Sequence, residues 1–292
     1  MPPTMNIVAV VPAWNEAATV AATVGPLLAA GCFSRVLVVD DGSTDATAEV
    51  ARAAGAEVLS LRPNRGKGGA MREAVEGILR DGTVGAVGFF DADLKGFSPE
   101  HARALVAPVA EGRAAMVCGL RDYGPAWNSI QRTLPPITGE RVVRAEVLRA
   151  LPAHFWSGYR IEMGLNAAAL AMPRLGPVLL VDLPGLGIVN KTEKFGVAEG
   201  MVRHARMTRE VLCAMRDAWG YFGLAVPPGH ALAATLGGLP EGPTDVTVPT
   251  VVPAVVPAVV PAVPVGSRAL APRRPVQRTI PYGSTASTRG VL

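Results

Sequence analysis

Four short apolar runs alternate with helix-like segments in the N-terminal part of the chain, and this alternation restricts the folds that the chain can adopt. The runs are residues 6–11, 35–40, 57–61 and 84–90. Continuous apolar runs of this length are typical of strands that are buried on both faces of a parallel sheet. The segments with helical character between them are residues 16–30, 46–54 and 70–80. Because parallel strands need crossover connections, the pattern predicts an α/β fold with a mostly parallel, doubly wound sheet flanked by helices.

The alternation continues less regularly as far as about residue 225. Ser98 and Pro99 are a favourable helix start, since serine caps helices and proline suits the first helical position. Further helices are predicted at residues 98–111, 139–151, 161–172 and 198–222, and further strands at residues 114–120 and 178–183. The helix at residues 139–151 is predicted to be amphipathic and rich in arginine. Arg141 and Arg144 would then lie on a solvated helix face or contact an anion.

The composition changes after about residue 225, where proline and glycine become dense. Val251–Ala262 repeats the sequence Val-Val-Pro-Ala three times. A proline at every fourth residue excludes a helix and a central strand. Residues 226–292 are therefore predicted to be an extended or disordered Pro-rich tail of low complexity.

Polar or glycine-rich loops follow each of the four N-terminal strands, at residues 12–16, 40–45, 62–69 and 91–93. In a parallel α/β sheet, ligands bind at the carboxyl ends of the strands. The four loops are expected to meet at that rim and to form one binding site.

Asp91 and Asp93 stand two residues apart directly after the fourth strand. Such a pair can reach one hard divalent cation, which prefers oxygen ligands and keeps positions open for phosphate. Taken alone, an Asp-x-Asp pair is more often an ordinary turn. Lys67 stands between glycines and could approach an anionic ligand closely, although no Ser or Thr follows it and Leu61 replaces the first glycine of a phosphate-binding P-loop.

Composition narrows the class of ligand and the location. The formal net charge of +4 is compatible with small anionic ligands but is too weak to argue for nucleic acid. The three cysteines are widely separated, which favours reduced thiols and a cytoplasmic protein. No apolar run approaches the roughly 18 residues that a membrane span needs. A peripheral contact with the inner face of the membrane and a homodimer are left open.

The loops contain four motifs in a fixed order, namely Val11-Pro12-Ala13-Trp14-Asn15-Glu16, Val39-Asp40-Asp41-Gly42-Ser43-Thr44-Asp45, Arg65-Gly66-Lys67-Gly68 and Asp91-Ala92-Asp93. Their order and spacing resemble family 2 nucleotide-sugar glycosyltransferases, which have the Rossmann-like GT-A fold. The resemblance covers about residues 5–210. Thr138-Gly139-Glu140 and Gly158-Tyr159-Arg160-Ile161-Glu162 resemble the branch that holds glucosyl-3-phosphoglycerate synthases and polyprenyl-phosphate sugar transferases.

The resemblance implies a metal-dependent transfer of a sugar from a nucleotide diphosphate sugar. UDP-glucose is the first expectation for the donor and GDP-mannose the second. The acceptor would be a small phosphorylated or hydroxylated molecule, or a lipid phosphate. Residues 5–120 would form a nucleotide-sugar half and residues 121–225 an acceptor half of one domain, 1–225, that precedes the tail.

The resemblance also implies roles for individual residues. Asp93 would bind Mg²⁺ or Mn²⁺ directly, and Asp91 would hold the ribose or reach the metal through water. Glu162 would be the catalytic base, although a glutamate at a helix N-terminus is equally expected for its dipole, and a phosphate acceptor needs no base. The nucleotide-sugar-binding residues would be Pro12, Ala13, Asn15, Glu16, Asp41, Lys67, Asp91 and Ala92. The acceptor-binding residues would be Thr138, Gly139, Asn190 and Lys191.

One position departs from the phosphoglycerate branch, which carries a histidine shortly after the last strand. The corresponding segment, residues 187–192, contains Asn190 and Lys191 and no histidine. Two alternatives to a transferase are a sugar-phosphate nucleotidyltransferase and a non-catalytic sugar-nucleotide-binding protein. The first usually has a glycine-rich loop after the first strand, and residues 12–16 contain no glycine. The second does not explain the intact pair Asp91 and Asp93.

Overall fold

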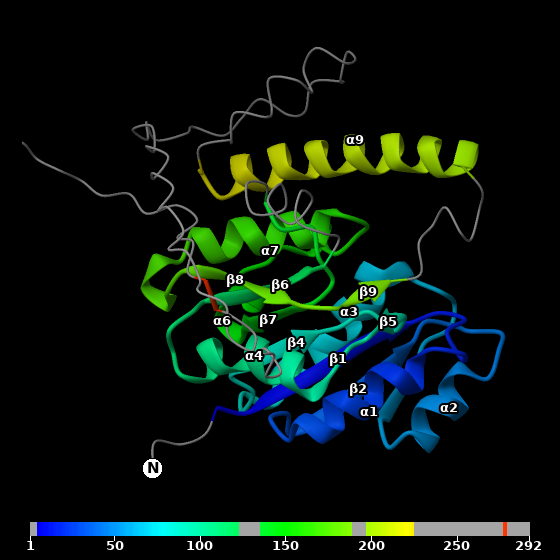
Figure 1. The fold of residues 1–292 in the computed structure, drawn as a ribbon. Helices are drawn as coiled ribbons and strands as arrows, with labels where there is room; N and C mark the ends of the chain where they lie inside the picture. The colour runs from blue at the N-terminus through cyan, green and yellow to red at the C-terminus, as the bar shows by residue number, and fades with distance from the viewer. Residues whose placement is uncertain (1–4, 123–134, 189–196, 225–276, 279–292) are drawn as a thin grey trace, which may run out of the picture.

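The computed structural model describes residues 5–122, 135–188, 197–224 and 277–278, and its main body is one twisted sheet between two layers of helices (Figure 1). Within these residues the sheet has eight strands in the order β10-β8-β6-β7-β4-β1-β2-β3. Its strands are β1 (Ile7–Ala13), β2 (Arg35–Asp40), β3 (Glu57–Ser60), β4 (Ala86–Phe89), β6 (Met116–Arg121), β7 (Arg141–Arg144), β8 (Val178–Leu183) and β10 (Gln277–Arg278). A separate pair is formed by β5 (Leu94–Lys95) and β9 (Gly187–Ile188).

The pairing is mostly parallel, as predicted. Strands β1, β2, β3 and β4 run parallel to one another, and so do β6 and β8. Strand β7 lies antiparallel between β4 and β6, and β10 lies antiparallel on β8. The sheet is therefore a mixed sheet with a parallel N-terminal half.

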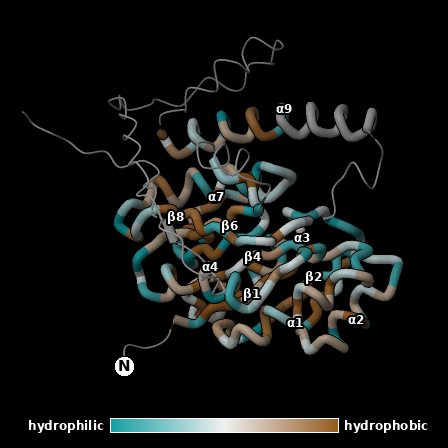
Figure 2. Tube along the Cα trace, in the orientation of Figure 1, coloured by the Kyte–Doolittle hydropathy of each residue, from teal (hydrophilic) through white to brown (hydrophobic). Residues whose placement is uncertain are grey.

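Helices cover both faces of the sheet, and the core is divided accordingly. The helices are α1 (Val20–Ala30), α2 (Thr47–Ala53), α3 (Gly66–Ile78), α4 (Pro99–Ala110), α6 (Ala145–Arg149), α7 (Arg160–Leu170) and α9 (Val197–Tyr221). One apolar cluster joins the sheet to α3, α6, α7 and α9, and the other joins it to α1, α2 and α4. Figure 2 shows hydrophobic residues along the central strands, where both clusters meet the sheet. The predicted start of α4 is confirmed, since Ser98 Oγ accepts a hydrogen bond from His101 N at 3.4 Å.

The predicted helix at residues 139–151 is wrong, because its first part is the strand β7 and only Ala145–Arg149 is helical. Val142 and Val143 are both fully buried, and they belong to opposite apolar clusters. Neighbouring side chains point to opposite faces only in a strand. The arginines at either end of β7 gave the segment its amphipathic pattern.

Among the element boundaries that differ from the prediction, three lie next to the loops of the predicted site. Helix α1 begins at Val20, four residues later than expected, and includes Pro26. Helix α3 begins at Gly66, so that Lys67 belongs to its first turn and not to a loop. Strand β1 continues through Pro12 to Ala13, two residues beyond the apolar run 6–11 from which it was predicted.

Strand β1 tolerates Pro12 because that residue faces a position where β4 has already ended. The carbonyl of Val10 accepts a hydrogen bond from Phe90 N at 3.1 Å. The backbone N atoms and C=O groups of Val10, and of Pro12 two residues later, therefore face the side of β1 on which β4 lies. The pairing between β1 and β4 ends at Val10 and Phe89. The missing N–H of Pro12 therefore costs no bond in the sheet.

Most of the predicted tail lies outside the described residues. Gln277 and Arg278 are described, and they pair with Val181 and Leu180 of β8. In the described part of the chain, every helix is too short or too polar to span a bilayer.

Candidate active site

A cavity of about 370 Å³ lies at the carboxyl ends of β1, β2 and β4. Its lining residues are Pro12, Ala13, Trp14, Glu16, Asp41, Asn64, Gly66, Lys67, Asp91, Ala92 and Asp93. They come from all four loops that were expected to converge, and the convergence is therefore confirmed as geometry. Eight of the predicted site residues are in this lining, namely Pro12, Ala13, Glu16, Asp41, Lys67, Asp91, Ala92 and Asp93.

Asn15 is not among the lining residues and instead joins the first loop to the second. Its backbone φ is 55°, in the left-handed region that asparagine tolerates better than most residues. Its side-chain Oδ1 accepts a hydrogen bond from Thr44 N at 2.8 Å, and its own N–H donates to Ser43 Oγ at 2.9 Å. Asn15 therefore holds the first and second loops together without lining the cavity itself.

Asp41 joins the second loop to the third. It is 3% exposed, and its Oδ1 accepts a hydrogen bond from Arg65 N at 2.8 Å. Its carbonyl accepts a second bond from Asn64 Nδ2 at 2.8 Å. These bonds hold the carboxylate of Asp41 at the cavity wall, immediately before the first turn of α3.

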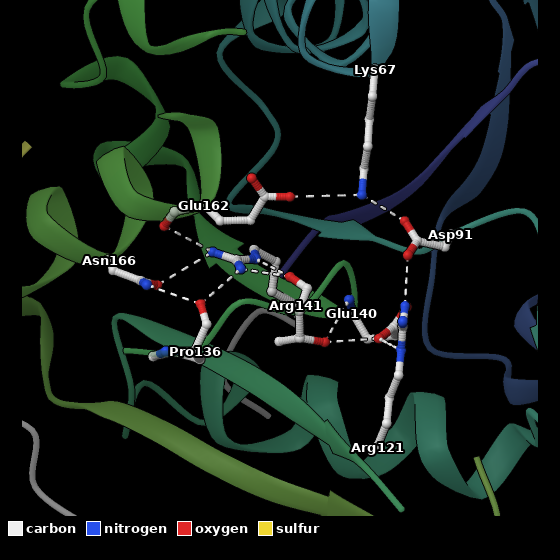
Figure 3. A network of polar contacts seen from close by, with 9 residues as sticks. Lys67, Asp91, Arg121, Pro136, Glu140, Arg141, Glu162 and Asn166 are labelled. Carbon is white, nitrogen blue, oxygen red and sulfur yellow. Dashed lines mark hydrogen bonds and ion pairs between the residues drawn. The ribbon is translucent and has the colours of Figure 1, made fainter. Parts of the chain in front are cut away.

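Two positively charged side chains bind Asp91, one on each carboxylate oxygen (Figure 3). Lys67 Nζ donates to Oδ1 at 2.7 Å, and Arg121 Nη2 donates to Oδ2 at 2.6 Å. Burial alone would raise the pKa of Asp91, but Lys67 and Arg121 outweigh it and hold the pKa well below its ordinary value. Burial would lower the pKa of Lys67, yet Asp91 and Glu162 outweigh it and raise that pKa above its ordinary value. Both groups are therefore charged at neutral pH.

Arg121 is held in turn by Glu140, which is fully buried. Arg121 Nε donates to Glu140 Oε2 at 2.8 Å and Nη2 donates to Oε1 at 2.6 Å, in the bidentate geometry that arginine favours. Thr138 Oγ1 also donates to Glu140 Oε2, at 2.8 Å. This arrangement fixes the guanidinium beside Asp91.

Gly139 lies against the carboxylate of Asp91. A Cβ at this position would overlap both carboxylate oxygens, so that only glycine fits without moving Asp91. Thr138 and Gly139 were predicted to bind the acceptor. Gly139 places this segment against the Asp91 carboxylate, which also contacts Lys67.

Glu162 approaches the same pair from the first turn of α7. Its Oε1 lies 3.7 Å from Lys67 Nζ, and its side chain is 10% exposed. Within the described residues, its Oε2 is buried and has no hydrogen-bond partner. A buried acceptor without a donor is energetically unfavourable, and such an atom is a candidate ligand contact.

Gly68 lets helix α3 approach this region closely. An added Cβ there would lie 2.6 Å from the carbonyl oxygen of Trp156, a few residues before α7. The basic glycine motif therefore serves packing as well as the cavity, because it brings Lys67 within reach of both Asp91 and Glu162.

Several residues of the site were not predicted from the sequence. Trp14, Asn64 and Gly66 line the cavity, and Arg121 contacts Asp91. The signal for Trp14 was its place inside the first loop motif, and the signal for Arg121 was its position at the carboxyl end of a strand. The predicted acceptor residues Asn190 and Lys191 lie outside the described residues.

Comparison of the sequence with known proteins identifies similar glycosyltransferases. The family model described as glycosyl transferase family 2 matches residues 8–154. Glucosyl-3-phosphoglycerate synthase of Mycolicibacterium smegmatis is 28% identical over 247 residues, which cover 72% of this chain and 77% of that protein. Glycosyltransferase AglJ of Haloferax volcanii is 47% identical over 75 residues, which cover 25% of this chain and only 24% of that protein.

Solved structures of similar fold include glucosyl-3-phosphoglycerate synthase of Mycobacterium tuberculosis. Its complex with Mn²⁺, UDP and glucosyl-3-phosphoglycerate has a TM-score of 0.59 at 26% identity and covers 76% of this chain and 81% of that one. The complex with Mn²⁺, UDP-glucose and phosphoglyceric acid has a TM-score of 0.57 at 26% identity, with the same coverage.

Proposed function

Because the chain belongs to the glycosyl transferase family 2, we propose that it transfers glucose from UDP-glucose to the hydroxyl group of a small phosphorylated acid such as 3-phosphoglycerate. Relatives that share most of their length with this chain are named for that product. The observation that carries the proposal is the position of Glu162, whose Oε1 lies 3.7 Å from Lys67 Nζ and whose Oε2 is buried without a hydrogen-bond partner among the described residues.

The donor nucleotide would occupy the cavity between the first three loops. Trp14 is 56% exposed and offers a flat apolar surface, as aromatic side chains do for nucleobases. Asp41 supplies a fixed hydrogen-bond acceptor in the same wall. The remaining predicted contacts of the donor are Pro12, Ala13, Glu16 and Ala92. Lys67, in the first turn of α3, adds a positive charge and a helix N-terminus for the diphosphate.

The carboxylates of the cavity fit a divalent cation bound through one aspartate. Both oxygens of Asp91 accept hydrogen bonds from cationic side chains, and Asp93 lines the cavity. Among the described residues, no group of three or more His, Cys, Asp or Glu side chains forms a metal cage. Mg²⁺ commonly needs only one or two carboxylates when substrate phosphates complete its shell, so Asp93 would hold Mg²⁺ or Mn²⁺ with the diphosphate. When bound, the cation supplies positive charge to the departing diphosphate.

The acceptor would approach from the side of Thr138, Gly139 and Glu162. A free carboxylate oxygen accepts a proton from a hydroxyl group but repels a phosphate oxyanion. The orphan Oε2 of Glu162 therefore favours a hydroxyl nucleophile over the lipid phosphate that was left open. Glu162 would accept the hydroxyl proton as the oxygen attacks the anomeric carbon and the bond from that carbon to the diphosphate breaks.

The same arrangement supports the proposed division of residues 1–225 into two halves. The cavity lining comes from residues 12–93, whereas Thr138, Gly139 and Glu162 come from the second half. Asn190 and Lys191 stay proposed acceptor contacts. A cytoplasmic location, a peripheral membrane contact, a homodimer and a low-complexity tail at residues 226–292 likewise stay predictions.

The test is an assay of the purified chain with UDP-glucose, 3-phosphoglycerate and either Mn²⁺ or Mg²⁺. The expected result is release of UDP together with a product of the mass of glucosyl-phosphoglycerate, and loss of both when EDTA is added. Transfer to a polyprenyl phosphate in place of phosphoglycerate would overturn the proposed acceptor. Release of pyrophosphate from UTP and glucose 1-phosphate would indicate a nucleotidyltransferase instead.

A further inference from the structure

Arg141 is a fully buried cation in the middle of the acceptor side. It lies on β7, is 1% exposed, and is one of the largest completely buried side chains among the described residues. The sequence suggested a solvated residue or an anion contact for it. Neither description fits, because the side chain is enclosed by protein.

Every N–H group of the Arg141 guanidinium is used inside the protein (Figure 3). Nε donates to the carbonyl of Thr138 at 3.1 Å, and Nη2 donates to the same carbonyl at 2.5 Å and to that of Pro136 at 3.4 Å. Nη1 donates to the carbonyl of Glu162 and to Asn166 Oδ1, both at 3.3 Å. Because arginine has five N–H donors, none is left for a substrate.

These bonds connect two segments that are far apart in the sequence. One is the turn from Pro136 to Gly139, which packs against Asp91. The other is the first turn of α7, which carries Glu162. Asn166 Nδ2 donates to the carbonyl of Pro136 at 3.0 Å, which is a second link between α7 and the turn 136–139.

The contacts of Arg141 are carbonyl and amide oxygens, and among the described residues none is a carboxylate. Burying a charge without an ionic partner is costly. Arg141 therefore acts here through its N–H donors and not through an ion pair. A planar donor fork that can bind several carbonyls in fixed directions is what arginine offers and lysine does not.

We propose that Arg141 is a positioning residue that holds the turn 136–139 and the first turn of α7 at a fixed separation, so that the Glu162 carboxylate meets the acceptor hydroxyl beside Asp91. What the acceptor is rests on the proposed function. The fixed separation itself rests only on the bonds of Arg141 and Asn166.

The experiment compares Arg141→Lys, Arg141→Met and Asn166→Leu with the wild type. The matched control is Arg149→Met, at an exposed arginine at the end of α6. Calorimetry with UDP and Mn²⁺ measures the donor site, and initial rates measure kcat/KM for 3-phosphoglycerate. In variants whose circular dichroism is native, kcat/KM for the acceptor should fall at least tenfold while UDP affinity stays within twofold. Arg141→Lys should lose as much activity as Arg141→Met, because lysine keeps the positive charge but lacks the planar set of N–H donors of the guanidinium. Arg149→Met should behave as the wild type.

Two outcomes would overturn the proposal. A wild-type kcat/KM for the acceptor in Arg141→Lys would mean that the charge matters and not the planar set of N–H donors. Equal losses of UDP affinity and of kcat/KM for the acceptor in folded variants would mean that Arg141 has only a structural role.

A substrate-free measurement separates this proposal from the proposed function. Hydrogen–deuterium exchange of Arg141→Lys should be faster in peptides that cover residues 136–139 and 160–166, and unchanged in the peptide that covers residues 12–16. If the wild type does not use phosphoglycerate, the proposed function fails and the exchange result still decides the role of Arg141. Unchanged exchange at both acceptor segments would refute that role.

Discussion

Lys67 Nζ lies 2.7 Å from Oδ1 of Asp91, and this contact joins the first turn of α3 to the end of β4. Two motifs that are 24 residues apart in the sequence thereby become one charged pair. Arg121 completes the arrangement on the other oxygen of Asp91. The site therefore holds Asp91 between two cationic side chains and has Asp93 in the cavity lining.

The charged pair predicts a pH dependence of stability. The pKa of Asp91 is lowered in the folded state, so its contribution is present above the unfolded value of about 3.9 and is lost as the pH falls below it. The pKa of Lys67 is raised, so its contribution persists below about 10.4 and does not change between pH 3 and pH 8. The difference in unfolding free energy between wild type and Asp91→Asn should be constant from about pH 5 to pH 8 and should narrow below about pH 4. Urea denaturation at each pH measures it, and an equal difference at pH 3 and pH 6 would contradict the assignment.

Asp93→Asn should abolish the metal dependence of donor binding. The substitution keeps the shape of the side chain and removes the charge that would hold a divalent cation beside the diphosphate. We expect kcat to fall by roughly 100-fold or more, in the range seen when one electrostatic contact to the transition state is lost. Calorimetry should show that Mn²⁺ no longer increases UDP affinity, while affinity without metal is unchanged. A variant that still responds to Mn²⁺ would remove Asp93 from the metal site.

Glu162→Gln should separate chemistry from binding. Glutamine has nearly the same shape but cannot accept the acceptor proton, and a general base typically contributes about 10²–10⁴ in rate. UDP affinity should be unchanged and kcat should fall within that range. The matched control is Glu49→Gln on the exposed face of α2, which should retain full activity. A Glu162→Gln enzyme with normal kcat would show that Glu162 is only a helix N-terminal acid.

Gly139→Ala should displace the Asp91 carboxylate, because the added methyl group would overlap its oxygens. A displacement near 1 Å at a reacting centre can cost about 100-fold in rate. The control is Gly77→Ala in α3, where an added Cβ has no heavy atom within 4 Å. That change should leave activity intact and stabilise the helix by about 0.5–1 kcal/mol. Similar activities of the two variants would show that Asp91 can move without loss.

Trp14→Ala should weaken nucleotide binding with little effect on folding, since the side chain is more than half exposed. Base stacking on an aromatic side chain is worth about 1–3 kcal/mol, so UDP affinity should fall by roughly 5- to 150-fold. Trp14→Phe should recover much of the loss. Calorimetry with UDP and with inorganic pyrophosphate separates the base from the phosphates, and pyrophosphate binding should not change.

The donor side of the site could be predicted from the sequence because its information is local. Each of the first four strands is a continuous apolar run, and each is followed by its own polar loop. The rule that parallel strands present their carboxyl ends to one rim then places those loops together. The cavity lining confirms that placement for Asp41, Lys67 and Asp93.

The acceptor side could not be predicted in the same way, because its contacts are between distant residues. Arg141 resembles a surface residue by its charge, and its burial is made acceptable by the carbonyls and the amide oxygen that accept its five N–H groups. Glu140 is similarly buried because Arg121, 19 residues earlier, neutralises it. A prediction from the spacing of apolar residues treats charged residues as exposed. With Arg141 and Arg144 taken as exposed, the segment fitted an amphipathic helix, whereas the chain forms the central strand β7.

Strand β10 changes how the C-terminal region is attached to the rest of the protein. Leu224 follows α9, and Gln277 pairs with β8, so the chain between them is anchored at both ends. The two residues of β10 cover Val181 and Leu180, so that this part of β8 does not present an unpaired sheet edge to another chain.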